Sequence, residues 1–151
     1  MSERMRPKRA DYRHFLAIPT RWGDNDAYAH INNTVYYSFF DNVVSRFLLE
    51  SGAIDLRTSA VIGVVVETGC RYLAPMSFPD LATAGLRVAR IGRTSIRYEI
   101  GIFRNEEDAA SAEGHFIHVY VDRATQAVPT PLPPALIAAV TPLLVGQAPA
   151  G

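Results

Sequence analysis

The sequence predicts an α+β protein in which a curled sheet wraps around one long helix. Three observations carry this prediction: a long apolar run at helical spacing lies near the start of the chain, four strand-like segments follow it, and no linker interrupts the 151 residues. A chain of this length can bury one substantial core. We therefore expect a single domain over residues 1–151, with its core at about 13–123.

The first predicted elements are a strand and the long helix. The segment from His14 to Trp22 alternates weakly between apolar and polar residues and leads into a loop rich in Asp and Asn. After Asn33 the apolar spacing changes to three and four residues, and Gly52 follows the run as a helix stop. Apolar residues cover most of the helix circumference, so other structure should wrap it. The main stripe consists of Tyr36, Phe40, Val43, Val44, Phe47 and Leu48.

Four longer strands are expected after the helix, at 61–76, 81–91, 94–104 and 109–122. In the third of these, isoleucines and Tyr98 alternate with Arg97 and Glu99, which predicts one face on the core. Short turns at 92–93 and 105–108 should make the last three strands antiparallel neighbours. Prolines at 129–134 end the sheet, and a short helix at 135–144, interrupted by Pro142, closes the chain.

Composition narrows the classes of function. Fifteen basic and fifteen acidic side chains balance, so no overall charge favours nucleic acid or an anionic membrane as partner. The single cysteine, Cys70, excludes an internal disulfide, and His115 and His118 should face opposite sides of a strand, so no metal site is expected. No apolar segment has the length of a secretory signal or membrane span, which favours a cytoplasmic protein. The basic segment 1–9 and the end at 146–151 are expected to be frayed.

The most informative segment directly precedes the helix and reads Asp24-Asn25-Asp26-Ala27-Tyr28-Ala29-His30-Ile31-Asn32-Asn33. It places a carboxylate pair and a histidine beside a helix start, where unpaired N–H groups favour negative charge. The two asparagines can cap the first of these N–H groups. A base next to such donors suits the attack on a carbonyl whose oxygen becomes an anion.

This segment, with Tyr36-Tyr37 and the helix after it, resembles the hotdog-fold acyl-CoA thioesterases of the 4-hydroxybenzoyl-CoA thioesterase type. The segment Arg71-Tyr72-Leu73-Ala74-Pro75 is similar to that family's second strand, and the resemblance spans about Phe15 to Val121. It implies hydrolysis of an acyl or aryl thioester to the free acid and coenzyme A, with no metal or redox cofactor. It also implies a homodimer or homotetramer whose active sites lie between subunits.

The resemblance also assigns roles to residues. Asp26 would act on the thioester as general base or nucleophile, and the backbone N–H near Asn33 would hold the carbonyl oxygen. His30 could position water or move a proton, or it could only fix the loop by hydrogen bonds. The residues expected to bind substrate are Asn32 at the helix start, Tyr36, Tyr37 and Phe40 in the acyl pocket, Glu67 near the attacking water, and Arg90, Arg93, Thr94 and Ser95 at the nucleotide.

Several alternatives stay open at this stage. Asp24 is interpreted as a structural residue that accepts loop N–H groups, and Asp41, within the helix, is the second candidate for the base. Ala29 stands where the family usually has glycine, and if that position needs a positive φ, alanine costs about 1 kcal/mol there. A hydratase or dehydratase acting on acyl thioesters, or a non-catalytic acyl-CoA binding protein, would use the same fold.

Overall fold

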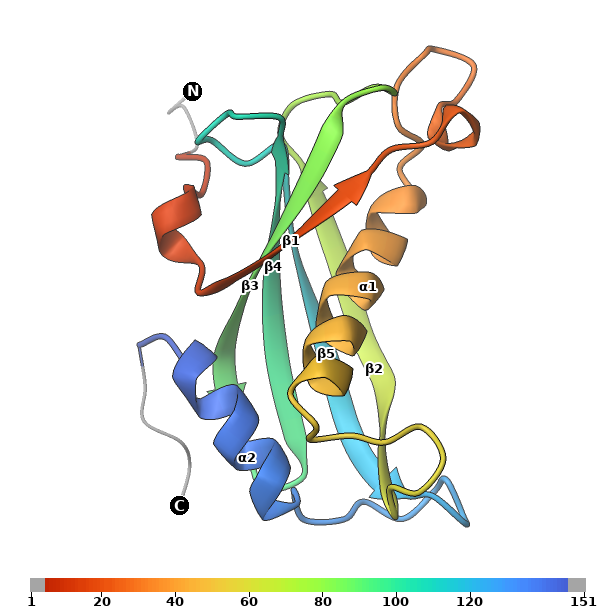
Figure 1. Cartoon of the computed structure of the whole chain (residues 1–151), viewed down its shortest axis with the longest axis vertical. Helices are drawn as coiled ribbons and strands as arrows, with labels where there is room; N and C mark the ends of the chain where they lie inside the picture. Colours follow the sequence, from red (N-terminus) through yellow and green to blue (C-terminus); the bar gives the residue numbers. More distant parts are fainter. Residues whose placement is uncertain (1–4, 147–151) are drawn as a thin grey trace.

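The computed structural model describes residues 5–146, which form one five-stranded antiparallel sheet curled around a long helix (Figure 1). The strand order is β1-β3-β4-β5-β2, so β1 and β2 are the edges. The predicted α+β fold and the hotdog architecture are thus confirmed. The elements are β1 His14–Pro19, α1 Val35–Glu50, β2 Val61–Tyr72, β3 Leu81–Ile91, β4 Ser95–Arg104, β5 Ala112–Asp122 and α2 Pro134–Val140, with 3-10 turns at Arg9–Asp11, Trp22–Asp24 and Thr141–Leu143.

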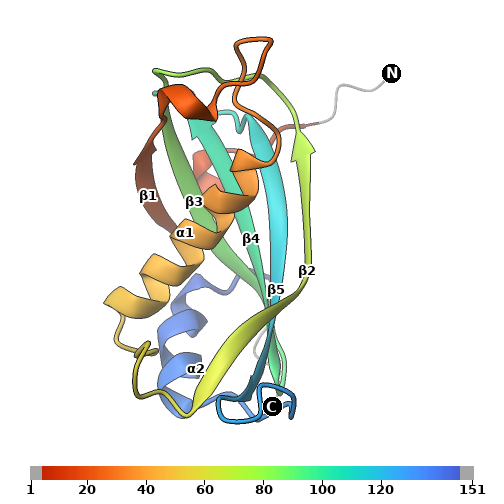
Figure 2. The same ribbon diagram turned by 90° about the vertical axis from the view of Figure 1, so that its right-hand side faces the viewer.

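The core lies between α1 and the face of the sheet that curls around it, and Figure 2 shows both helices on this side. The predicted inward residues of β4, from Ile96 to Ile102, are fully buried, as are Phe40, Val43 and Val44 of α1. Each large apolar side chain buried in this way contributes about 1.5–3 kcal/mol. Leu136 and Val140 of α2 are also fully buried in this cluster, so the core extends past residue 123.

The outer face of the sheet is partly covered by the N-terminal segment. Tyr12 packs edge-on against Phe103, and its ring lies over Gly101, where a Cβ would come within 2.6 Å of it. Arg6 Nε donates to the Ala110 carbonyl at 2.8 Å, and Arg9 binds the Asn105 carbonyl at 2.7 Å. The expectation of a frayed segment is therefore wrong from Arg6 onward. For 1–4 and 147–151 that expectation lies outside the described residues.

Element boundaries differ from the predictions by three or more residues at four places, one of which is the start of β5, at Ala112 instead of residue 109. β1 ends at Pro19, and β2 ends at Tyr72 because the next two N–H groups, of Leu73 and Ala74, both donate to the Ser111 carbonyl and leave the ladder. The C-terminal helix ends at Val140, and Pro142 falls in the 3-10 turn after it, as the predicted interruption implies. None of the helices within residues 5–146 is both long and apolar enough to span a membrane.

The loop before α1 and the β3–β4 hairpin lie at opposite ends of the sheet (Figure 1). β3 connects the two ends, and its 11 residues span roughly 35 Å at about 3.3 Å per residue. The helix α1 begins at the same end as the loop and stops at Glu50, followed by Gly52 with φ of +74°. The predicted helix stop at Gly52 is thus confirmed.

A buried polar chain sits among the apolar side chains of β4 and β5. The Tyr98 and Tyr120 hydroxyls are 2.8 Å apart, and His118 Nδ1 lies 3.3 Å from the Tyr120 hydroxyl. His118 is 7% exposed, and burial lowers its pKa from 6.5 to about 4. As expected from their spacing, His115 faces the other side of the sheet, where its Nε2 is 2.8 Å from Glu67.

His118 should make folding sensitive to acid. Because its folded pKa is lowered, the unfolded chain binds the extra proton first, so stability is constant above about pH 6.5 and is lost as pH falls toward 4. The loss should be on the order of 3 kcal/mol. Urea unfolding of wild type and His118→Gln at fixed protein concentration measures it. If the free energy of unfolding of His118→Gln falls as steeply with pH as that of wild type, this assignment is wrong. The control variant His115→Gln should show the same pH dependence as wild type.

Candidate active site

The loop at residues 20–34 is built around the buried carboxylate of Asp24, which is 2% exposed. Its oxygens accept the Arg21 backbone N–H at 2.8 Å and the Arg21 guanidinium at 2.9 Å. Its own carbonyl accepts the Asn32 N–H at 2.8 Å, which joins the two ends of the loop. Asp24 is therefore the structural residue that the sequence indicated.

A second set of bonds ties the loop to residues 77–78. The Asn25 side chain accepts the Phe78 N–H at 3.0 Å, and the Ser77 hydroxyl donates to the Ala29 carbonyl at 2.7 Å. Ala29 has φ of 60°, so this position does adopt the positive φ that glycine would allow more easily. For alanine this costs about 1 kcal/mol, which the bonds on either side must offset.

Asp26 is held by the loop through one of its two carboxylate oxygens. Oδ1 accepts the N–H groups of Tyr28 at 2.8 Å and His30 at 3.3 Å, and the Asp26 N–H donates to the His30 carbonyl at 2.7 Å. Oδ2 forms no hydrogen bond with any group that the structure describes. The carboxylate is thus oriented, with one oxygen available for a water molecule or a substrate.

The backbone just before α1 includes a donor without an acceptor in the described part of the chain. The Asn32 side chain accepts both the N–H of Thr34, at 2.9 Å, and its hydroxyl, at 2.7 Å, while the Asn32 carbonyl accepts the Val35 N–H at 3.0 Å. The Tyr72 hydroxyl donates to the Asn33 carbonyl at 2.7 Å. The Asn33 N–H donates to no group among residues 5–146, so it can bind an oxygen outside the chain.

These groups meet in a pocket of about 390 Å³ at the junction of the loop, α1 and the end of β2. Asp26 and Asn33 both line it, beside the buried side chains of Ile31, Tyr36 and Met76. A base, a free N–H and an apolar wall are therefore placed around one space. The complete lining is Asp26, His30, Ile31, Asn33, Tyr36, Tyr72, Leu73, Ala74, Pro75 and Met76.

The tyrosines and the cysteine nearby stay neutral at physiological pH. Burial raises the pKa of Tyr36 to about 12 and that of Cys70 to about 11. Partial burial also raises the pKa of Tyr72. Phenols that stay protonated act as hydrogen-bond donors, and a protonated thiol is a poor nucleophile.

The helix supplies fewer pocket residues than the sequence suggested. Asn32 caps Thr34 but does not line the pocket, and the Asn33 side chain forms no cap among the described groups. Tyr37 is half-buried against Phe40, and Phe40 is completely buried over Gly114, so neither lines this pocket. The structure therefore assigns Phe40 to the core, because β5 covers it.

The second candidate base is also outside the pocket. Asp41 is exposed on the outer side of α1, where the Ser45 hydroxyl lies 3.4 Å from it. Arg46 pairs with Glu50 at 2.7 Å instead.

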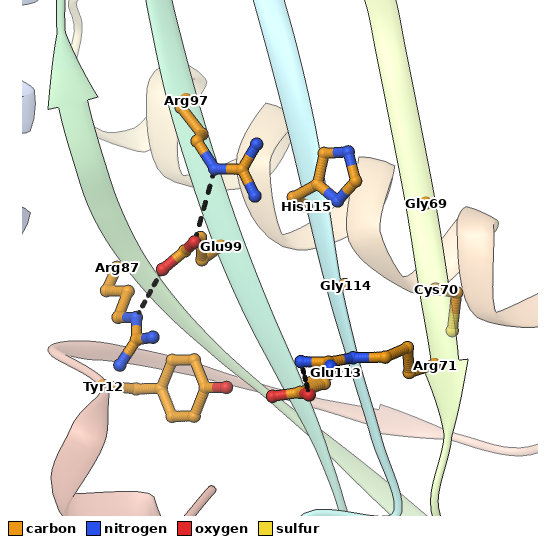
Figure 3. Close-up of a pocket in the computed structure, with 10 residues that line it drawn as sticks. All are labelled: Tyr12, Gly69, Cys70, Arg71, Arg87, Arg97, Glu99, Glu113, Gly114 and His115. Atoms are coloured by element: carbon orange, nitrogen blue, oxygen red, sulfur yellow. Dashed lines mark hydrogen bonds and ion pairs between the residues drawn. The ribbon is translucent and has the colours of Figure 1, made fainter.

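Glu67 lies on the outer face of the sheet and not in the pocket, because it is three residues before Cys70, which packs against the core from the opposite face of β2. It pairs with His115 at 2.8 Å. Figure 3 shows this face, with α1 behind the sheet and a hollow of about 320 Å³ whose charges pair with one another. Those pairs are Arg87–Glu99, Arg97–Glu99 and Arg71–Glu113.

The four residues predicted to bind the nucleotide, Arg90, Arg93, Thr94 and Ser95, do lie together at the β3–β4 hairpin. Both arginines are exposed, and neither forms an ion pair within residues 5–146. Within this chain, however, the hairpin lies at the end of the sheet opposite to the loop that carries Asp26 (Figure 1).

The sequence-based analysis missed Tyr72 as a site residue. The sequence did contain a signal for Tyr72, because this residue lies in the strand segment that carries the family resemblance. Its contact with Asn33, however, joins two residues that are 39 positions apart in the sequence. Met76 and Ile31 were missed for a similar reason, since both lie in irregular segments. Within the described residues, no three His, Cys, Asp or Glu side chains gather as they would around a metal ion.

Comparison with known protein families gives a match over most of the chain. Residues 20–140 match the thioesterase-like superfamily. No curated protein matches the sequence.

Solved structures are similar over most of the chain. The PA5185 protein from Pseudomonas aeruginosa strain PAO1 is 44% identical, with a TM-score of 0.89 over 94% of this chain and 99% of that one. The PA2801 protein, a candidate thioesterase from Pseudomonas aeruginosa, is 33% identical, with a TM-score of 0.76 over 84% and 97%. A thioesterase from Thermus thermophilus, solved with coenzyme A and Zn, is 28% identical, with a TM-score of 0.70 over 85% and 92%.

The family match covers the loop, the pocket and all strands after β1, and a relative at 44% identity spans nearly the whole chain. The chain belongs to the thioesterase-like superfamily.

Proposed function

We propose that this protein is an acyl-CoA thioesterase that hydrolyses an acyl or aryl thioester to the free acid and coenzyme A. Water is the only second reactant, because the C–S bond breaks without any change of oxidation state. Membership of the superfamily supports thioester hydrolysis. The Thermus thermophilus relative was solved with coenzyme A, which supports coenzyme A as the thiol that the reaction releases.

One observation carries this proposal: a carboxylate with a free oxygen and a backbone N–H with no acceptor line the same pocket. Asp26 would take a proton from the attacking water, or would attack the carbonyl carbon itself. The Asn33 N–H would hold the carbonyl oxygen as it becomes negative, at the positive end of α1. The buried side chains of Ile31, Tyr36 and Met76 would receive the acyl group.

Replacing Asp26 by asparagine should abolish most of the turnover. Asp26→Asn keeps the shape and can keep the loop bonds, but it removes the base, so kcat should fall about 10²- to 10⁴-fold with KM changed little. Thiol release from hexanoyl-CoA and benzoyl-CoA measures both parameters. Asp41→Asn is the matched control, and it should retain kcat. If Asp41→Asn loses kcat and Asp26→Asn retains it, Asp41 is the base instead of Asp26.

We also propose that two copies join through β2. Within residues 5–146 this strand pairs only with β5, so its outer edge carries backbone groups without a partner there, and Val65 and Val66 are 46% and 58% exposed. Such an edge invites a further strand. An antiparallel pairing of β2 with the β2 of a second copy would continue the sheet and cover these valines.

A charge placed at this edge should separate the copies. Val66→Lys should shift the protein from dimer or tetramer to monomer in light scattering, and kcat/KM should fall because the pocket lies at the end of the same strand. Val128→Lys, at an equally exposed valine in the loop after β5, should leave the assembly intact. A wild-type protein that is monomeric and fully active would exclude this arrangement.

The same pairing would explain where the nucleotide binds. Antiparallel β2 strands bring the Val61 end of one copy next to the Tyr72 end of the other, so the hairpin end of one sheet approaches the pocket end of its neighbour. Arg90, Arg93, Thr94 and Ser95 of the hairpin would then bind the phosphates of a coenzyme A whose thioester lies in the other copy's pocket.

Removing the hairpin cations should weaken binding without slowing the chemistry. The double variant Arg90→Gln/Arg93→Gln should raise KM for acyl-CoA about tenfold or more at unchanged kcat, because a charge-assisted hydrogen bond contributes about 1.5–3 kcal/mol. Thioesters of N-acetylcysteamine, which lack the nucleotide, should show no change. If the double variant loses kcat/KM equally with both kinds of thioester, the two arginines do not act by binding the nucleotide.

A further inference from the structure

We infer that the Tyr72 hydroxyl is a positioning group: it holds the Asn33 carbonyl, which fixes the backbone of Asn33 so that the free N–H of this residue faces the substrate carbonyl. The inference rests on the proposed function and adds a residue from the sheet to a site otherwise made by the loop and helix.

The argument begins with the backbone of Asn32, Asn33 and Thr34. The Asn32 N–H, the Asn32 carbonyl and the Thr34 N–H are each bound by the loop or the helix itself. Among the described residues, Tyr72 is the only one that bonds to the Asn33 carbonyl, at 2.7 Å. The peptide groups on both sides of Asn33 are thus held in place, and the Asn33 N–H is the one backbone donor of these three residues without an acceptor in the described part of the chain.

The Tyr72 side chain is itself held in place. Its ring packs edge-on against Tyr36, with centroids 5.2 Å apart at 84°, and Tyr36 is buried in the core. Tyr72 is the last residue of β2, where it pairs with Ala112 of β5. The hydroxyl therefore links the helix start to the sheet through a rigid contact.

The remaining loop contacts do not replace this bond. Asp24 and Asn25 fix the loop before Asn33, and Ser77 holds the Ala29 carbonyl, but none reaches the Asn33 carbonyl. Without the Tyr72 hydroxyl, this carbonyl has no partner among the described residues, and the Asn33–Thr34 peptide is held on one side only, through the Thr34 N–H bonded to Asn32, so the backbone of Asn33 can shift. A small error in the position of a catalytic donor is enough to cost a large factor in rate.

The test compares Tyr72→Phe with Tyr98→Phe. Each variant removes one phenolic hydroxyl, but the Tyr98 hydroxyl bonds to Tyr120 in the core near the hairpin end of β4, away from the pocket. Thiol release from hexanoyl-CoA and benzoyl-CoA gives kcat and KM. The ¹H–¹⁵N spectrum of each variant reports the Asn33 amide directly, and thermal unfolding reports stability.

Tyr72→Phe should lower kcat about 10- to 100-fold with KM within threefold of wild type, and should shift the Asn33 amide resonance. Tyr98→Phe should lower the melting temperature but change neither kcat nor the Asn33 resonance. An unchanged Asn33 resonance in Tyr72→Phe overturns the inference whatever the rate, and so does a wild-type kcat. If wild type releases no thiol, the proposed function fails, and the Asn33 resonance still decides the role of Tyr72.

Discussion

The packing of α1 into the curl of the sheet is the contact on which the rest of the structure depends. Phe40 lies completely buried over Gly114 of β5, and a Cβ at that glycine would collide with its ring. The absence of a side chain lets the helix approach the sheet closely, and the buried stripe from Tyr36 to Leu48 then fixes its axis. The position of Asn33 at the start of α1 therefore depends on the side chains that are buried further along the helix.

The loop before α1 shows how an irregular segment can be made precise. Asp24, Asn25 and Ser77 satisfy backbone groups that neither a helix nor a strand would pair. The same bonds hold Ala29 at a positive φ, which a residue with a Cβ otherwise avoids. Strain of this kind is common where a backbone turn aims catalytic groups, and here it lies between Asp26 and Asn33.

Strand order links the site to assembly. Because β2 is an edge, its last residue, Tyr72, can reach over the helix start, while its outer side is free for a second copy. The hairpin arginines stand at the wrong end of their own sheet for the Asp26 pocket. An antiparallel dimer would resolve this, since each copy would supply the end that the other lacks.

Local sequence patterns were enough to predict the fold class, the order of the elements and the position of the loop that carries Asp26. These follow from local signals: apolar spacing of two or of three and four, turn residues, and a polar segment next to a helix start. Tertiary structure decided which predicted residues share one space. It assigned Phe40 to the core, turned Glu67 to the outer face, and brought Tyr72 to Asn33. The periodicity of apolar residues predicts whether a side chain is buried or exposed. Which residue it contacts across the sheet depends on strand order and on where β2 stops pairing with β5, and no local pattern encodes either of these.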